Sequence, residues 1–248
     1  MLKRGMSVLL LLVLLFTANA FSDIYMKQKQ HTDAVTIMGQ SQPAEDVISE
    51  TWITPEKIAV MNENHKIVID LQKKTVTMAD HKSKTLTVIP MDFSKMSEGS
   101  GMSADEQTQM QNFMGNMFKL DLKIEPTDEH KKIGEWDCRK YNQTMEMGMG
   151  TSHSVIWATK EIHIDKDLYA KYVSGMMAQM PGISQNLDTV MKELEKIDGV
   201  QVLSEQTMDM MGQSFGSSSE LLEYKEAKAP ADAFTLPSGY KQQNPFQR

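Results

Sequence analysis

Methionine is the residue type whose abundance and spacing in this sequence suggest chemistry. The 248 residues include 22 methionines, and thioether sulfur is a soft ligand that suits Cu(I). Met145, Met147 and Met149 would share one face of a strand, but alternate strand residues stand about 6–7 Å apart, too far for three sulfurs to meet on one ion. The other clusters are Met102, Met110, Met114 and Met117; Met176, Met177 and Met180; and Met208, Met210 and Met211. The clusters therefore indicate core packing, the lining of an apolar cavity, or copper binding.

The histidines and the single cysteine do not form a recognisable catalytic or metal-binding motif. The six histidines lack H-x-x-x-H and H-E-x-x-H spacing, and only His153 and His163 flank a strand from which they could meet to bind zinc. Cys138, in "EWDCRKY", has no activating partner in the sequence around it, so we expect a half-buried strand cysteine. We predict that the protein is not an enzyme and that it has no catalytic residues, no metal site and no cofactor.

The first twenty residues are typical of a secretory signal peptide. Lys3 and Arg4 precede an apolar run at 8–16, and Ala18 and Ala20 form an A-x-A cleavage site. The run is shorter than the roughly 20 residues that a bilayer span needs, so we expect no transmembrane segment after cleavage. The predicted organisation is a signal peptide at 1–20 and a single domain at 21–248 with a loosely held C-terminal tail, located in the periplasm or outside the cell.

Composition excludes some classes of protein. Removing residues 1–20 takes away two cations and no acid, which moves the formal net charge from −7 to −9. Binding to nucleic acid needs a basic surface, and none is visible, so we predict no nucleic-acid partner. With one cysteine the chain has no internal disulfide, so its stability must come from packing.

Four short runs between residues 57 and 90 predict an antiparallel meander. "KIAVM", "KIVID", "TVTMAD" and "TLTVIP" are separated by only four residues each, and such connections join neighbouring antiparallel strands. Alternate residues share a face, so one apolar face is predicted to comprise Ile58, Val60, Ile67, Ile69, Val76, Met78, Leu86 and Val88. Burial of these side chains would contribute on the order of 10–20 kcal/mol, so something must cover them.

Helical patterns supply the expected cover. Ser103 and Glu106 form a capping box, and the helix that follows carries one apolar stripe: Met110, Phe113, Met114, Met117 and Phe118. Further helices are predicted at 166–180 and 186–199, and further strands on both sides of them. This order favours an α+β fold, in which a curved antiparallel sheet, an incomplete β-barrel, has helices covering its concave face.

Several segments resemble a known family. "VIDLQKKTVTMADHKSKTLTVI", "IGEWDCRKYNQTM", "SVIWATKEIHID", "KIDGVQVLSE" and "FTLPSGYK" resemble an uncharacterised family of exported bacterial proteins related in shape to the lipoprotein carrier LolA. The resemblance covers most of residues 23–242. It implies an open half-barrel closed by helices over a cavity that, in the carriers, receives acyl chains.

The function predicted from these features is non-catalytic binding of a lipid, an acyl chain or another apolar ligand in a half-barrel cavity. The predicted lining residues are Met110, Phe113, Met114, Met117, Phe118, Val76, Met78, Leu86, Val88 and Trp157. Two alternatives stay open at this point. One is an envelope structural or interaction module with a packed core and an envelope protein partner, and the other is a Met-rich periplasmic copper-binding protein.

Overall fold

A computed structural model describes residues 23–37, 40–91, 109, 120–148, 150–162, 164, 187–210 and 213–243. The strands in these ranges are β1 Ile24–Thr32, β2 Val35–Ile37, β3 Gln40–Gln42, β4 Glu45–Ile53, β5 Lys57–Met61, β6 His65–Asp70, β7 Thr75–Asp80, β8 Thr85–Pro90, β9 Leu120–Ile133, β10 Trp136–Met147, β11 Gly150–Thr159, β12 Val200–Met210, β13 Gln213–Glu226 and β14 Lys241–Gln243. Helix α3 spans Leu187–Leu194.

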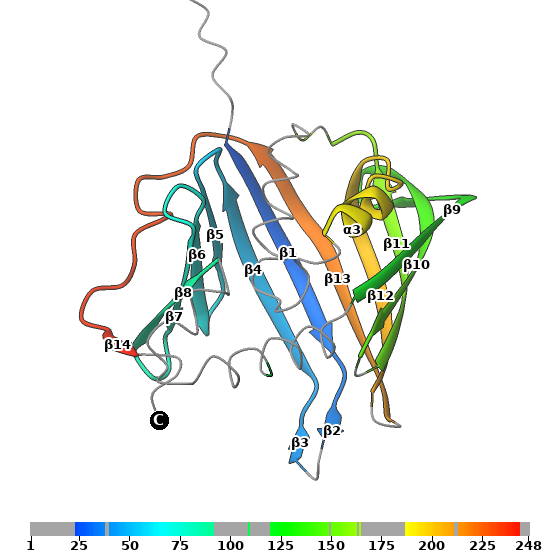
Figure 1. Cartoon of the computed structure of the whole chain (residues 1–248). Helices are drawn as coiled ribbons and strands as arrows, with labels where there is room; N and C mark the ends of the chain where they lie inside the picture. Colours follow the sequence, from blue (N-terminus) through cyan, green and yellow to red (C-terminus); the bar gives the residue numbers. More distant parts are fainter. Residues whose placement is uncertain are drawn as a thin grey trace, which may run out of the picture.

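Twelve of these strands form one curved, open sheet. Their order is β14-β8-β7-β6-β5-β4-β1-β13-β12-β11-β10-β9, and β2 and β3 pair separately. The pairs are antiparallel except β14 with β8. Figure 1 shows the sheet bending so that β5–β8 and β9–β11 form two arms, with α3 against the second arm. The predicted curved antiparallel sheet is confirmed, and strand content dominates the described residues.

The meander is confirmed strand by strand as β5, β6, β7 and β8. Its last two turns, at 71–74 and 81–84, have the same construction. In each, an aspartate that ends a strand accepts a backbone hydrogen bond inside the turn: Asp70 from Lys73 at 2.8 Å and Asp80 from Ser83 at 2.6 Å. Lys74, at the end of the first turn, has a left-handed φ of 53°. These short turns hold neighbouring strands in fixed register.

The register corrects the predicted face of β8. Val76 pairs with Ile89, whereas Val88 pairs with Thr77 and Leu86 pairs with Ala79. Leu86 and Val88 therefore lie on the face opposite to Val76, and Val88 is 38 % exposed. The prediction that they share the apolar face of Val76 and Met78 is wrong by one residue. The reason is that the turn at 81–84 pairs Asp80 with Thr85, and a shift of one residue moves a strand's side chains to the other face.

The two faces of the sheet can be followed by register. We call the inner face the one that carries Ile58 and Ile69 on the first arm and Ile156 on the second, where α3 packs. Residues that are paired across neighbouring strands share a face, so the inner face can be followed from the first arm to the second through every other residue of β1, β13 and β12. The opposite surface is the outer face. The amphipathic pattern of α3 points Val190 at the inner face, since this residue is 1 % exposed and belongs to a buried cluster with Tyr141 and Ile156.

Among the described residues, two buried clusters form the core. The larger combines strands of both arms: Ile24, Met26, Ile53, Ile58, Ile69, Val76, Cys138, Trp157, Ile162, Val200, Val202 and Leu221. The smaller lies beneath α3: Leu120, Leu122, Ile124, Tyr141, Ile156, Ala158 and Val190. The side chains of both clusters come from residues far apart in the sequence, so the fold depends on pairing of distant strands.

The segment after β13 lies along the first arm up to β14, and the last residues of the predicted tail, 244–248, lie outside the described residues. Lys66 Nζ donates to the carbonyl of Asp232 at 3.1 Å, and the Tyr240 hydroxyl is 2.9 Å from Nδ1 of His81. Ala233 is 3 % exposed, and β14 then pairs with β8. Because Lys66 pairs with Ala79, this segment covers the outer face. The sequence pattern predicts that the outer face of the first arm is exposed to solvent. Apolar residues on this face explain why the segment after β13 is attached there.

The predicted helix at 103–119 lies outside the described residues except for Gln109, which is helical, and the predicted helix at 166–180 lies outside them entirely. The helix predicted at 186–199 corresponds to α3. No helix within the described ranges has the length and apolar composition needed to cross a membrane.

Candidate functional site

The residues predicted to line an apolar cavity fall into three groups. Met110, Phe113, Met114, Met117 and Phe118 lie outside the described residues. Val76 and Met78 lie on the inner face of β7. Leu86 and Val88 have side chains that register places on the outer face. Of the described candidates, Val76 and Met78 are thus neighbours on the inner face, and Trp157 belongs to the same buried cluster as Val76.

Trp157 is buried among the residues that the structure describes. Its side chain is 7 % exposed, and Nζ of Lys131 lies 4.2 Å from the ring centroid. The indole Nε1 is buried and has no hydrogen-bond partner among the described residues, which costs free energy. The cation above the ring offsets part of that cost.

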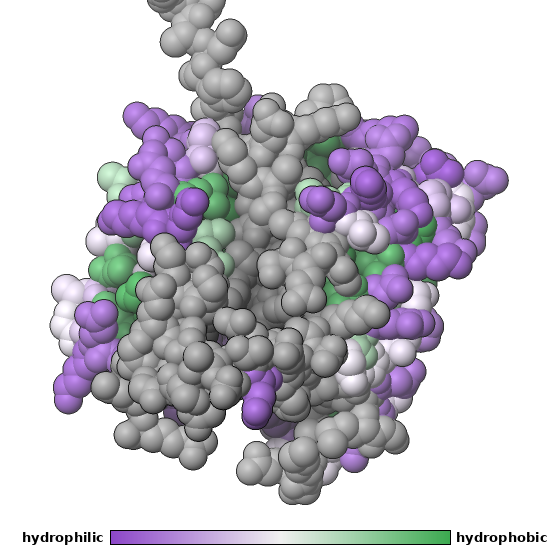
Figure 2. Space-filling model, viewed as in Figure 1, coloured by the Kyte–Doolittle hydropathy of each residue, from purple (hydrophilic) through white to green (hydrophobic). Residues whose placement is uncertain are grey.

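Two apolar rows cross the inner face of the first arm. In the first, Ile58, Ile69 and Val76 are aligned across β5, β6 and β7, and each is at most 3 % exposed. In the second, Val60, Ile67 and Met78 are aligned in the same way but are only half-buried. In Figure 2, apolar side chains are visible on the first arm and below α3. The inner face therefore carries apolar surface beyond what the core encloses.

Of the residues considered for metal binding or catalysis, Met145, Met147 and Cys138 pack into the protein, whereas His153 is exposed. Met145 and Met147 lie on one face of β10, as predicted, and pack against the cluster beneath α3, while Met149 and His163 lie outside the described residues. Among the described residues no group of three or more His, Cys, Asp or Glu side chains is placed to hold a metal ion. Cys138 is fully buried, and this burial raises the pKa of its thiol to about 11.

A G-x-S-x-G pattern is also present at 212–216. In a nucleophile elbow the serine sits on a sharp turn between a strand and a helix. Ser214 and Gly216 instead lie within the antiparallel strand β13, so the required context is missing here.

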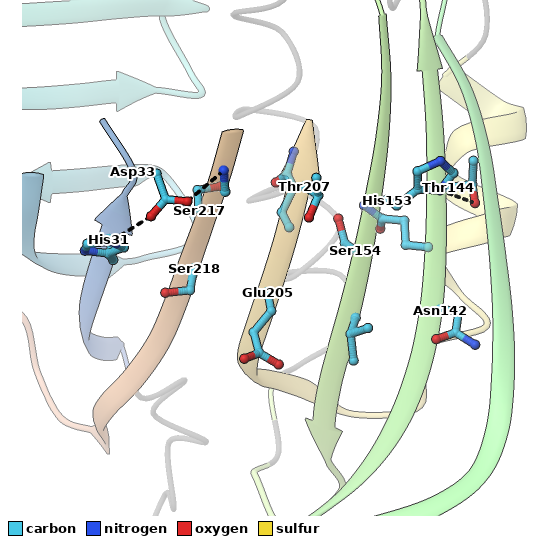
Figure 3. Close-up of a pocket in the computed structure, with 14 residues that line it drawn as sticks. His31, Asp33, Asn142, Thr144, His153, Ser154, Glu205, Thr207, Ser217 and Ser218 are labelled. Atoms are coloured by element: carbon cyan, nitrogen blue, oxygen red, sulfur yellow. Dashed lines mark hydrogen bonds and ion pairs between the residues drawn. The ribbon is translucent and has the colours of Figure 1, made fainter. Parts of the chain in front are cut away.

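A polar hollow of about 600 Å³ lies on the outer face. Two cross-strand rows form it. The first runs from His31 through Ser218, Glu205 and Val155 to Asn142, and the second from Asp33 and Gly216 through Thr207 and His153 to Thr144. Figure 3 shows these side chains spread over β1, β13, β12, β11 and β10, with α3 behind the sheet. The hollow and α3 are thus on opposite faces.

Small residues of β13 create the hollow. The run "GSSS" at 216–219 has no bulky side chain between β1 and β12. Asp33 is held against Gly216 by two hydrogen bonds: its N–H donates to the Gly216 carbonyl at 2.9 Å, and its Oδ2 accepts the Gly216 N–H at 3.0 Å. A Cβ at position 216 would collide with that carboxylate oxygen. Glycine is therefore needed here for close approach of Asp33.

His31 closes one end of the hollow. Its Nδ1 is 2.6 Å from Oδ1 of Asp46, and its Nε2 is 3.2 Å from Oδ1 of Asp33. These hydrogen bonds, that to Asp46 first, raise the pKa of His31 above its usual 6.5. Lys29 also pairs with Asp46 at 3.0 Å. Asp46 and Asp33 therefore compensate, within the rim, the charge that His31 carries when it is protonated.

The sequence did not point to this hollow. Its residues lie on the first and on the later strands, and the spacing of the histidines singles out His153 only as a possible zinc ligand together with His163. The one local signal is the Gly-Ser run of β13, because glycine is unfavourable in a strand interior and often marks a close backbone approach.

Comparisons with known proteins give structural neighbours only. No family model matches the chain, and no curated protein does. Solved structures similar to this one include an uncharacterised conserved protein from Thermus thermophilus, with a TM-score of 0.45 and 8 % identity over 91 % of this chain and 92 % of that one. Another is a putative outer membrane lipoprotein-sorting protein domain from Vibrio parahaemolyticus, with a TM-score of 0.33 and 5 % identity over 88 % and 91 %.

A third neighbour is a DUF1329 family protein from Desulfovibrio piger, with a TM-score of 0.33 and 8 % identity over 90 % of this chain and 93 % of that one. The neighbours thus include a lipoprotein-sorting domain and uncharacterised families, as the resemblance in the sequence predicts. All three TM-scores are below 0.5, so the functional proposals below rest on residues of this chain.

Proposed function

We propose that this protein is an exported, non-catalytic binding protein that holds a lipid, an acyl chain or another apolar ligand against the inner face of its sheet. The observation that carries the proposal is the half-buried row of Val60, Ile67 and Met78 beside the buried row of the same strands. Covering apolar surface that is in contact with water contributes about 25 cal/mol per Å². An apolar ligand laid along this row would gain that contribution.

Two features of the sequence complete the proposal. The amphipathic segment 103–119 would cover the ligand with its stripe of methionine and phenylalanine, and the glycine-serine stretch at 97–101 would act as its hinge. Residues 1–20 would direct export. Methionine in such a cover suits a ligand of variable shape, because its side chain is flexible and polarizable.

The test is native mass spectrometry of the protein purified from its own host, followed by titration of the delipidated protein with the fluorescent fatty acid cis-parinaric acid. We expect co-purified lipid and saturable fluorescence enhancement. A protein that is repeatedly recovered empty and gives no enhancement would contradict the proposal.

A matched pair of variants localises the binding. Met78→Gln puts a polar group of similar length on the inner face and should weaken fatty-acid binding about fivefold, since roughly 1 kcal/mol of apolar contact is lost. Val88→Gln makes a polar change at a partly exposed position on the outer face of the adjacent strand and should leave binding unchanged. Equal effects of the two variants would place the ligand elsewhere.

A further inference from the structure

The outer-face hollow is independent of the proposed apolar site, and its chemistry is different. Its fourteen lining residues are hydroxyl, carboxamide, imidazole and carboxylate side chains, with one valine and one glycine. Its volume of about 600 Å³ is within the roughly 300–1,000 Å³ range of small-molecule sites. The hollow is therefore large enough for a small polar ligand.

The charges of the lining residues determine whether the hollow favours a negatively or a positively charged ligand. Among the described residues, the lining contains no lysine or arginine, so an anion such as phosphate would find no permanent cation among them. His31 is committed to Asp46 and Asp33, and Asp33 is further occupied by the Gly216 N–H. These contacts remove the imidazole and one carboxylate from ligand binding, so the unused charge in the hollow is negative.

Glu205 carries that unused charge. It lies on β12, the middle strand of the hollow, directly between Ser218 of β13 and Val155 of β11. Its carboxylate makes no hydrogen bond or ion pair with another described residue. Beside it, Ser218 provides a further oxygen acceptor, and Asn142 provides another at the end of the same row, beyond Val155. An ionised carboxylate next to neutral acceptors suits a group that only donates hydrogen bonds.

We infer that this hollow is a second binding site, specific for a small polar ligand that carries an ammonium group, with Glu205 as its anionic anchor. The hydroxyl of Ser218, on the neighbouring strand, accepts a further ammonium proton, and the carboxamide of Asn142, two strands from Glu205 on the other side, is placed to bind a second polar group of an extended ligand. The methyl groups of Val155 contact the carbon next to the nitrogen. A free polyamine and a lysine side chain of a peptide share this chemistry.

The experiment is a ¹H–¹⁵N correlation titration of the full mature chain, which detects weak binding residue by residue. The probes are spermidine, a short lysine-containing peptide, glucose and inorganic phosphate. We expect spermidine or the peptide to shift the amides of Glu205 and Ser218 and the side-chain amide of Asn142 in a saturable way. Stronger binding of spermidine identifies a free amine as the ligand, and stronger binding of the peptide identifies a lysine side chain. The response should weaken as salt rises, because exposed charges are screened.

Matched variants separate a site from general attraction to an acidic surface. Glu205→Gln keeps the shape and removes the charge, and should weaken spermidine binding about fivefold or more. Glu220→Gln makes the same change in net charge on the same face, two residues along β13 from Ser218 and outside the lining, and should have less than about a twofold effect. Ser218→Leu fills the hollow and should abolish the shifts while the thermal unfolding transition is retained.

Three outcomes overturn the inference. One is the absence of shifts with either amine. Another is equal weakening by Glu205→Gln and Glu220→Gln, which indicates non-specific attraction. The third is a response to glucose or phosphate that exceeds the response to both amines. Because the probes and variants concern the outer face, failure here leaves the fatty-acid experiment unaffected, and the reverse also holds.

Discussion

Nδ1 of His31 lies 2.6 Å from Oδ1 of Asp46, which links β1 to β4 on the outer face. The other ring nitrogen faces Asp33 at 3.2 Å, and a neutral imidazole can donate from only one nitrogen. Two carboxylate acceptors therefore favour the imidazolium form. Consistently, the hydrogen bond with His31 is the main cause that lowers the pKa of Asp46 below its usual 3.8.

We predict that His31 titrates with a pKa above 6.5 in the folded protein, and that Asp46→Asn moves this pKa downward. Since the folded pKa of His31 is raised, its contribution to stability is fully present below pH 6.5 and is lost as the pH rises through the folded pKa. The contribution of Asp46, whose pKa is lowered, is lost as the pH falls through its folded value. Imidazole proton shifts followed by NMR provide the measurement. A His31 pKa that does not respond to Asp46→Asn would contradict the assignment.

Cys138 should be chemically inert in the folded protein. Its side chain is 0 % exposed, and burial raises its thiol pKa to about 11, while the thiolate is the reactive form. We expect iodoacetamide at about pH 8 to leave Cys138 unmodified in native protein and to alkylate it fully in guanidinium chloride. Mass spectrometry after each reaction gives the answer. Rapid modification of the native protein would mean that β10 opens or that the thiol is activated.

The part of the fold that could be predicted from sequence is the part fixed by local rules. Four-residue turns and a two-residue period identify β5, β6, β7 and β8. The same pattern fails for the face of β8, because "TLTVIP" has apolar residues at both parities, and only the turn at 81–84 decides that Ile89 joins Val76. Periodicity identifies a strand, but the turn sets which of its faces is buried.

The polar hollow depends on information of another kind. His31 meets Ser218 because the first strand, β1, pairs with β13 near the end of the chain, and Glu205 joins them through β12. No local pattern specifies pairing between strands so distant in sequence, since it is decided by packing of the whole sheet. The apolar lining residues at 110–118, by contrast, were selected by a helical stripe and remain a prediction.

Tyr141 joins the core to the turn that follows α3. It is 0 % exposed, and its hydroxyl oxygen accepts the backbone N–H of Asp198 at 3.1 Å. Tyr141→Phe keeps the ring but leaves that N–H without its acceptor, which should cost about 1–2 kcal/mol in the free energy of unfolding. Urea unfolding followed by circular dichroism measures it. Unchanged stability would mean that water replaces the hydroxyl.

Gly199 and Gly239 both have positive φ, and alanine substitutions at the two positions distinguish the cost of a steric clash from the cost of backbone strain. Gly199 has φ of 121°, and a Cβ there would overlap the backbone carbonyl of Thr159, whereas Gly239 has φ of 78° and open space around the same position. At Gly239 an alanine adds only the left-handed backbone cost, about 1 kcal/mol.

At Gly199 the backbone of β11 cannot move aside without disturbing its pairing with β12, since Thr159 is opposite Val200. Gly199→Ala should therefore destabilise the protein by about 3 kcal/mol or more, well beyond Gly239→Ala. Chemical denaturation of both variants compares them directly. If the two substitutions lowered the free energy of unfolding equally, the close approach of Gly199 to Thr159 would not be a feature of the protein in solution. The turn from α3 into β12 would then be looser than the hydrogen bond from Asp198 to Tyr141 implies.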